Sequence, residues 1–335
     1  MLIDFITSDQ TIRVDEVFIN NLRYMHSLKM PDFSKVKPFP SDDSGDFSEK
    51  ACDFNKCLAY NSVFREALRR IFDYSADRMR AGGRDRELSP FLEKALPDES
   101  LAKWWVAETD VAHTVASFDY LVDICNKESF SYNEQLTVLS SILVHDCAYP
   151  PTDEHTKIDV RLEHMVEGVK AFEIIARSIN AEFRRMHTIY DFDVVEEFQE
   201  RVPFPNITEE NSIIGQHDNP SIGRLFSYES VKPRMVWAHR EADRLWMLDK
   251  AGFALDLLRL LKKSKPYNPE KLLRHVIGRH VEEGESYPDN QNCRTIQDDI
   301  FDFEGKKTLY RTDAGYQMFL ELINERAREY NIRVH

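Results

Sequence analysis

Apolar side chains recur every three or four residues over most of this 335-residue chain, and this period buries one face of an α-helix. Glycine is scarce, with 11 residues against 21 phenylalanines, so tight turns are expected to be few. Strand-like alternation is rare, and only residues 306–310 are expected to pair weakly. The strongest helical stripes cover residues 54–80, 102–124, 133–145, 159–180, 233–261 and 312–330. The chain is therefore predicted to be all-α.

The segments between the stripes are less regular. Residues 1–30 are expected to form one or two short helices. Residues 31–50 hold three prolines and a Ser/Asp cluster, which predicts a loop. Residues 262–310 are polar and are expected to be irregular.

The charge balance narrows the class of partner. The 44 basic residues are outnumbered by 58 acidic ones, which gives a net charge of −14. Such a surface repels phosphate backbones, so extended nucleic acid is not an expected partner, whereas a small anion is compatible with a metal or local cations. Five scattered cysteines are typical of reduced thiols in a cytoplasmic protein. No membrane-spanning run and no signal peptide are evident, so a cytoplasmic location without membrane contact is expected.

One ordered series of residues has the chemistry of metal ligands. It contains the pair His145-Asp146, at the end of an apolar run, and on other predicted helices His113, His164, His217 and Asp243. Chance supplies about one His-Asp dipeptide in such a chain, so the pair alone carries little weight. Imidazole and carboxylate groups suit divalent metals, and separate helices of a bundle can deliver them to one cavity. The full series is therefore a candidate ligand list.

The series and its local contexts resemble the HD superfamily of metal-dependent phosphohydrolases. The matching segments are Ser140–Pro150, which ends an apolar helix in His-Asp, Glu163–Gly168 with its His-x-x-x-Gly spacing, Ile213–Pro220 and Glu241–Leu245. The likeness covers roughly residues 105–260. It implies an HD-domain helical bundle around a metal site in residues 101–262, with helical additions at 1–100 and 263–335.

The resemblance also implies a ligand set for two divalent ions. One ion would be held by His113, His145, Asp146 and Asp243, and the other by His164 and His217, with Asp146 as the bridge. Iron, manganese or cobalt are the expected metals, with magnesium or nickel as alternatives. A metal-bridging hydroxide would then attack a phosphate ester or anhydride of a small molecule, with a nucleotide as the favoured substrate.

Several residues have more open roles. Arg161 precedes His164 by three residues and is the first choice for a phosphate contact. Asp146 and Arg161 are the expected catalytic residues. Tyr149 stands where many HD members have a lysine. Asp249 is a rival for Asp243, and His239 is either a partner of the ligands or an exposed or interhelical histidine. His280 lies among basic residues and is expected at the surface.

Two other functions stay open. HD-fold proteins with this ligand set include mixed-valence di-iron oxygenases, and a third reading is a non-catalytic domain that senses nucleotides. The oligomeric state is not fixed by the sequence, and a homo-oligomer is compatible with it.

Overall fold

The computed structural model describes residues 2–6, 11–36, 54–82, 88, 91, 108–148, 158–189, 203–204, 207–218, 233–287, 292–298 and 300–333, apart from a few side chains within these ranges. Its strands are β1 (Leu2–Ile6) and β2 (Thr11–Asp15), and a 3-10 turn covers Phe33–Lys35. Its α-helices are α1 (Glu16–Ser27), α2 (Phe54–Gly82), α5 (Thr109–Lys127), α6 (Tyr132–Ile142), α7 (Ile158–Ile189), α9 (Ile207–Ile214), α10 (Pro233–Leu245), α11 (Lys250–Lys262), α12 (Pro269–Ser286) and α13 (Asp313–Glu329). Most of the described chain is helical, so the all-α prediction is confirmed.

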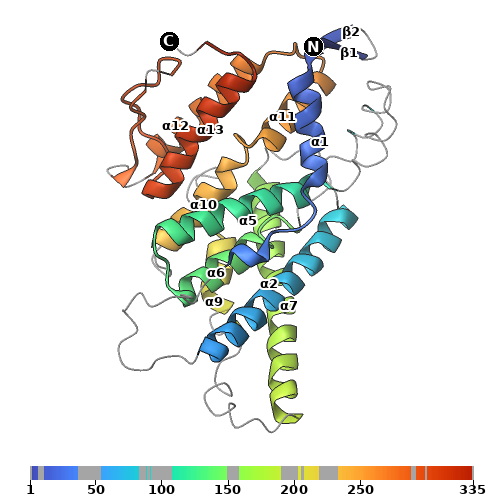
Figure 1. Ribbon diagram of the computed structural model, residues 1–335, viewed down its shortest axis with the longest axis vertical. Coiled ribbons are helices and arrows are strands. Elements are labelled where there is room, and N and C mark those ends of the chain that lie inside the picture. The colour runs from blue at the N-terminus through green and yellow to red at the C-terminus, as the bar shows by residue number, and fades with distance from the viewer. Residues whose placement is uncertain are drawn as a thin grey trace.

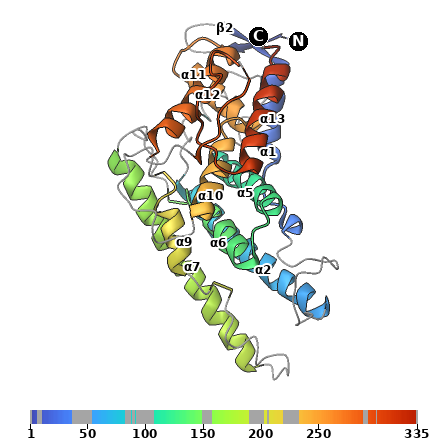
Figure 2. The same cartoon turned by 90° about the vertical axis from the view of Figure 1, so that its left-hand side faces the viewer.

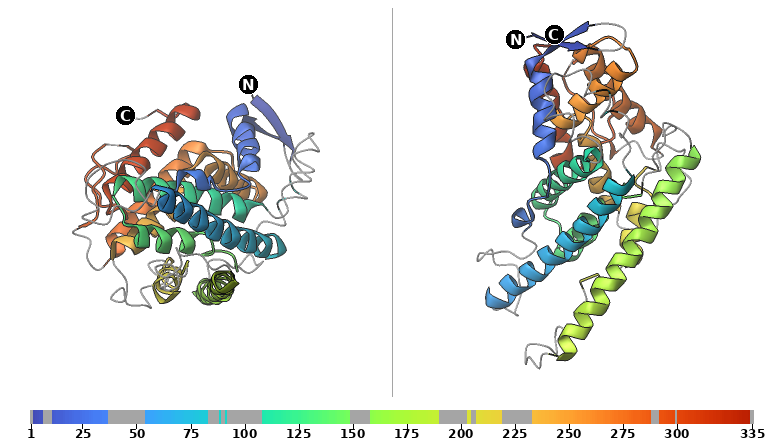
Figure 3. Two further views of the ribbon diagram at one scale, coloured as in Figure 1. Left: turned by 60° about the horizontal axis from the view of Figure 1, so that its bottom comes forward. Right: turned by 90° about the vertical axis from the view of Figure 1, so that its right-hand side faces the viewer.

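Helices α5 and α10 pack against each other at the centre of the bundle (Figure 1). Helices α6 and α9 cover α10, and α2 packs on both α5 and α6. The long helix α7 contacts α2 and α9 and runs along one outer side, where one of its ends extends past the other helices (Figure 2). Helices α7 and α9 are both seen nearly end-on in the left view of Figure 3. Helix α13 packs on α10 and α5, with α12 beside it.

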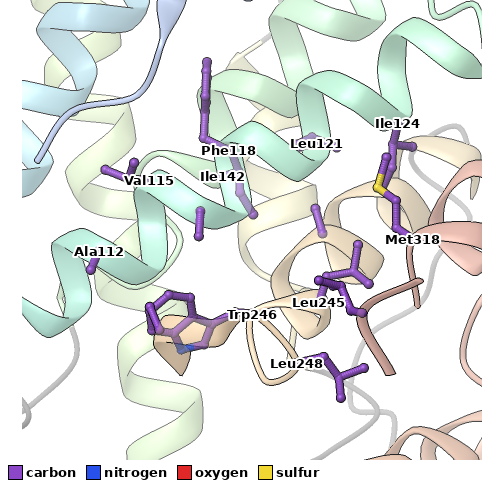
Figure 4. Close-up of a cluster of buried hydrophobic side chains, with 14 of the residues drawn as sticks. Ala112, Val115, Phe118, Leu121, Ile124, Ile142, Leu245, Trp246, Leu248 and Met318 are labelled. Atoms are coloured by element: carbon purple, nitrogen blue, oxygen red, sulfur yellow. The ribbon is translucent and has the colours of Figure 1, made fainter. Parts of the chain in front are cut away.

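The apolar core is densest around α5. Residues 109–118 of this helix are all buried, so α5 has no solvent-facing side over its first half. Figure 4 shows its apolar side chains together with Leu245, Trp246 and Leu248 from the end of α10 and the turn that follows, and Met318 from α13. Fully burying one large apolar side chain contributes about 1.5–3 kcal/mol, so this cluster fixes α5 and α10 relative to each other.

The N-terminal segment differs from the helix that its sequence predicts. Strands β1 and β2 form an antiparallel hairpin in which Leu2 lies opposite Asp15 and Ile6 lies opposite Thr11. Only then does the helical stripe of α1 begin. Each strand has five residues, which is too short for its alternation to be distinguished from a helical period.

The predicted helix over residues 233–261 is in fact two helices. The backbone turns at residues 246–249, and the carboxylate of Asp249 caps α11 by accepting a hydrogen bond from the Ala251 N–H at 2.7 Å. Gly252 makes the close turn feasible, because a Cβ there would lie 2.0 Å from the carbonyl oxygen of Trp246. The apolar stripe continues through the break, so periodicity alone hides it.

Residues 262–310 are more ordered than predicted. Helix α12 begins at Pro269, and the Asn268 side chain caps it by accepting from the Lys271 N–H at 2.9 Å. The weak pairing expected near residues 306–310 is confirmed by an antiparallel bridge between Thr295 and Lys307. Among the described residues, no helix is both long and apolar enough to cross a membrane.

Candidate metal centre

The structure brings all six predicted ligands into one cluster in the interior. Each comes from its own element, except for the adjacent His145 and Asp146, which lie in the turns after α6. The others are His113 on α5, His164 on α7, His217 in the turn after α9 and Asp243 on α10. None of the six residues is more than 7% exposed. The cluster contains two groups of ligand atoms that could each hold a metal ion.

The first group contains His113, His145 and Asp146. The Nδ1 atom of His113 lies 3.4 Å from Asp146 Oδ2, and Nε2 of His145 lies 3.7 Å from the same oxygen. Asp243 adjoins this group, because its Oδ1 atom is 2.8 Å from His113 Nε2 and 3.3 Å from His145 Nε2. Asp243 therefore either adds an oxygen ligand here or orients the His113 ring.

The second group contains Asp146, His164 and His217. The Nε2 atoms of both histidines lie 3.5 Å from Asp146 Oδ1 and 3.1 Å from each other. Asp146 thus presents Oδ2 to the first group and Oδ1 to the second. A carboxylate placed in this way can bridge two sites.

Hydrogen bonds to the backbone fix the tautomers of two of these histidines. His145 and His217 each stand three residues after the last residue of a short helix. Their Nδ1–H groups donate to the carbonyl oxygens of Ile142 and Ile214, at 2.8 and 2.7 Å. Since a carbonyl only accepts, each neutral ring has an unprotonated Nε2. The Nε2 atom of His145 lies near oxygens of Asp146 and Asp243, and that of His217 lies near Asp146 and the ring of His164. A cation would stabilise such a group of acceptors.

The same geometry governs the charges in the cluster. Burial lowers the pKa of His113, but hydrogen bonds and charge from Asp146 and Asp243 outweigh it and raise the pKa to about 9. Burial also lowers the pKa of His217, but the hydrogen bond and charge of Asp146 outweigh it, so the pKa is raised. For Asp243, burial favours the neutral acid, but Arg244 and the imidazoles hold its pKa well below the usual range. The buried carboxylates therefore demand positive charge, from protons or from a metal.

Gly168 explains how α7 reaches the cluster. It lies one turn after His164 on the same helix face. A Cβ at this position would be 3.0 Å from the carbonyl oxygen of His145 and 3.2 Å from a methyl carbon of Ile214. Glycine thus allows α7 to approach the His-Asp turn and the end of α9 together. The His-x-x-x-Gly spacing has a steric reason.

Other residues that the sequence singles out are placed as follows. The side chain of Arg161 and the whole of Tyr149 lie outside the described residues. Asp249 is not part of the cluster, since it caps α11 and accepts a hydrogen bond from the Tyr120 hydroxyl at 2.7 Å. The expectation for His280 is wrong, because this histidine is fully buried among α12, Tyr310 and Phe319.

His239 lies directly beside the ligands. Its ring centroid is 5.4 Å from that of His145 and 5.9 Å from that of His217, and its side chain is fully buried. Neither of its ring nitrogens has a hydrogen-bond partner within the described chain. Burial, together with the neighbouring imidazoles, lowers its pKa well below the usual value. His239 is therefore a neutral ring that packs against both His145 and His217.

Two further neighbours carry no signal in the sequence. Trp246 stacks on His113, with ring centroids 5.4 Å apart and planes inclined by 25°. Its indole forms a wall of the first group, although its spacing reads as ordinary core. Glu283 reaches the cluster from α12 through Arg244, and a charged residue in a polar segment gives no indication of this.

No protein-family model matches the chain, and comparisons with curated proteins and with solved structures found no match either. The buried cluster is compatible with an HD-type metal site, and it could coordinate a metal ion.

Proposed function

We propose that the protein is a metal-dependent phosphohydrolase of the HD type that cleaves a phosphate ester or anhydride of a small molecule, with nucleotides as the favoured class. The observation that carries this proposal is the pair of ligand groups that share Asp146. Binuclear centres of this kind are suited to phosphoryl transfer, and the ordered ligand series has the local contexts of that superfamily.

The residues of the cluster have distinct parts in this proposal. When bound, two divalent ions such as iron, manganese or cobalt would lower the pKa of a coordinated water and offset the charge of phosphoryl oxygens. Asp146 would bridge the two positions through its two oxygens. His145 and His217, each held by a backbone carbonyl, would keep Nε2 directed into the cluster. Arg161, three residues before His164 on α7, is proposed to contact the phosphate.

The electrostatics favour an anionic substrate only when the metal is present. The chain has a net charge of −14, and the cluster itself holds buried carboxylates. A phosphorylated molecule would be repelled by this field unless cations offset it locally. Catalysis should therefore depend strictly on metal, and chelation should abolish it.

The test is metal analysis of the protein purified without added metal, followed by a screen of phosphorylated metabolites with manganese, iron or cobalt. Bound metal and released phosphate are expected, and both should be lost in Asp146→Ala. An Asp146→Ala variant that kept its metal and its full activity would overturn the proposal. Oxygen consumption without phosphate release would assign the oxygenase chemistry instead, and nucleotide binding without turnover would assign a sensor.

A further inference from the structure

A single buried arginine joins the metal cluster to helix α12. Arg244 donates from Nη1 to Asp243 Oδ2 at 2.9 Å and from Nη2 to Asp218 Oδ1 at 3.0 Å. Its Nε atom lies 3.0 and 3.1 Å from the two carboxylate oxygens of Glu283. One guanidinium therefore contacts three carboxylates, from α10, from the turn after α9 and from α12.

This contact decides which oxygen Asp243 presents to the histidines. Arg244 occupies Oδ2, so Oδ1 is left to face His113 and His145 at 2.8 and 3.3 Å. Asp218, the second carboxylate on the guanidinium, directly follows His217 in the chain. Arg244 thus touches Asp243, which adjoins the first group, and the chain neighbour of His217 in the second group. The orientation of its guanidinium affects both.

Glu283 holds the guanidinium through its Nε atom. The side chains of Arg244 and Glu283 are only 13% and 10% exposed, so solvent cannot readily replace this ion pair. Arg279 also approaches Glu283, but at 3.9 Å and from a more exposed position, 37%. The backbone next to Glu283 is closely packed, since a Cβ on the adjacent Gly284 would lie 2.3 Å from the carbonyl carbon of Thr308.

We propose that Glu283 is a positioning residue for the metal centre, acting through Arg244 to hold Asp243 in its ligand orientation. This inference rests on the metal centre of the proposed function, not on the reaction. Without the Glu283 charge, Arg244 is free to turn further onto Asp243 and Asp218 and to compete with the metal for their oxygens. Outer partners of ligands typically change metal affinity 10- to 100-fold.

The experiment measures Mn²⁺ affinity of the full-length protein by titration against a competing chelator. Glu283→Gln is expected to weaken binding about 10- to 100-fold. Glu282→Gln is the matched control, because Glu282 is the residue before Glu283 on α12 and its side chain is exposed. This variant should keep the wild-type affinity. The absorption spectrum of the Co²⁺ form should also change in Glu283→Gln alone, since it reports on ligand geometry.

A second control separates positioning from loss of stability. Glu128 accepts a hydrogen bond from the Ala314 N–H at 2.8 Å and so helps to dock α13. Glu128→Gln should lower Tm without weakening Mn²⁺ binding. Equal affinity in Glu283→Gln and the wild type, or equal loss in Glu128→Gln, would overturn the inference. Absence of metal binding in the wild type would instead overturn the proposed function.

Discussion

His145 and His217, which each follow a short helix, reach the cluster through the same local geometry. In both cases the chain leaves the helix, and the imidazole folds back to donate to the carbonyl three residues earlier. This hydrogen bond directs Nε2 into the cluster, where it could coordinate a metal ion. Single side chains also determine how the two groups are connected, since Asp146 is a member of both.

The shared carboxylate leads to a prediction about metal content. Asp146→Ala should lose both ions, because each ligand group loses an oxygen. His217→Ala should lose one ion and keep the other, since the first group is untouched. Metal per chain, measured by elemental analysis after dialysis, gives the answer, with the exposed His275→Ala as the control. Two ions retained in His217→Ala would remove His217 from the ligand set.

Glu210 is a buried acid whose titration should control stability. It is fully buried on α9, and neither carboxyl oxygen has a hydrogen-bond partner among the residues that the structure describes. Burial, with a smaller effect of Glu209, raises its pKa from 4.5 to about 8. The folded state therefore binds this proton more tightly than the unfolded state. The stability that it contributes is complete below pH 4.5 and is lost as the pH rises through 8.

Glu210→Gln should remove this pH dependence. The variant is expected to be more stable than the wild type by about 2–4 kcal/mol at pH 8, with little difference at pH 5, because each pKa unit corresponds to about 1.4 kcal/mol. Urea unfolding at several pH values measures the difference. Glu209→Gln, at a partly exposed neighbouring position, should follow the wild-type curve. A constant offset at all pH values would show that Glu210 does not titrate in this range.

At the scale of elements, the sequence identified most helices because their apolar stripes are long. The sequence also singled out the six residues that the structure brings into one cluster, since each lies on an apolar stripe or just after the end of one. It could not show the break between α10 and α11, because the stripe runs through it and only the Asp249 cap and the Gly252 contact with Trp246 reveal it. Helix α12 was hidden by its many charges. Contacts such as Glu283 with Arg244 depend on tertiary packing, which one sequence does not encode in any local pattern.

The approach of α7 to the His-Asp turn can be tested at one glycine. Gly168→Ala should push α7 away from the His145 carbonyl, destabilise the protein by about 1–3 kcal/mol and weaken the metal position that uses His164. Gly278→Ala is the matched control in the middle of α12, where a Cβ would be 3.5 Å from Phe303, an ordinary contact. It should be neutral or stabilising, since alanine favours helix by about 1 kcal/mol. Chemical unfolding and Mn²⁺ titration compare them, and equal behaviour of the two variants would contradict the steric argument.

At the scale of the whole molecule, both ends of the described chain pack into one continuous core. Buried apolar residues of α1, α2, α5, α10 and α13 belong to a single cluster. The amide of Asn21 on α1 donates to Glu329 and to the Tyr330 hydroxyl, both at 3.3 Å, at the end of α13. Glu241 on α10 accepts from the N–H groups of Arg311 and Thr312, at 2.6 and 3.0 Å, where α13 begins. The helix that carries Asp243 thus also anchors the C-terminal segment.

This continuity predicts that the metal-free protein unfolds in one cooperative transition. Far-UV circular dichroism and tryptophan fluorescence should report the same Tm, because no described helix has a core of its own. Gly284→Ala should test the coupling most directly, since its Cβ would lie 2.3 Å from the Thr308 carbonyl carbon and force α12 off residues 308–309. The cost should be about 1–3 kcal/mol, equivalent to about 2–4 °C in Tm.

The form of the Gly284→Ala unfolding transition shows whether α12 and α13 unfold together with the rest of the core or separately from it. If the core is continuous, the whole transition moves to lower temperature, and both probes still coincide. The variant should also bind Mn²⁺ more weakly, because Glu283 moves with α12 and Arg244 loses its support. A separate early transition, with the main one unchanged and metal affinity intact, would mean that α12 and α13 fold independently of the helices that hold the cluster.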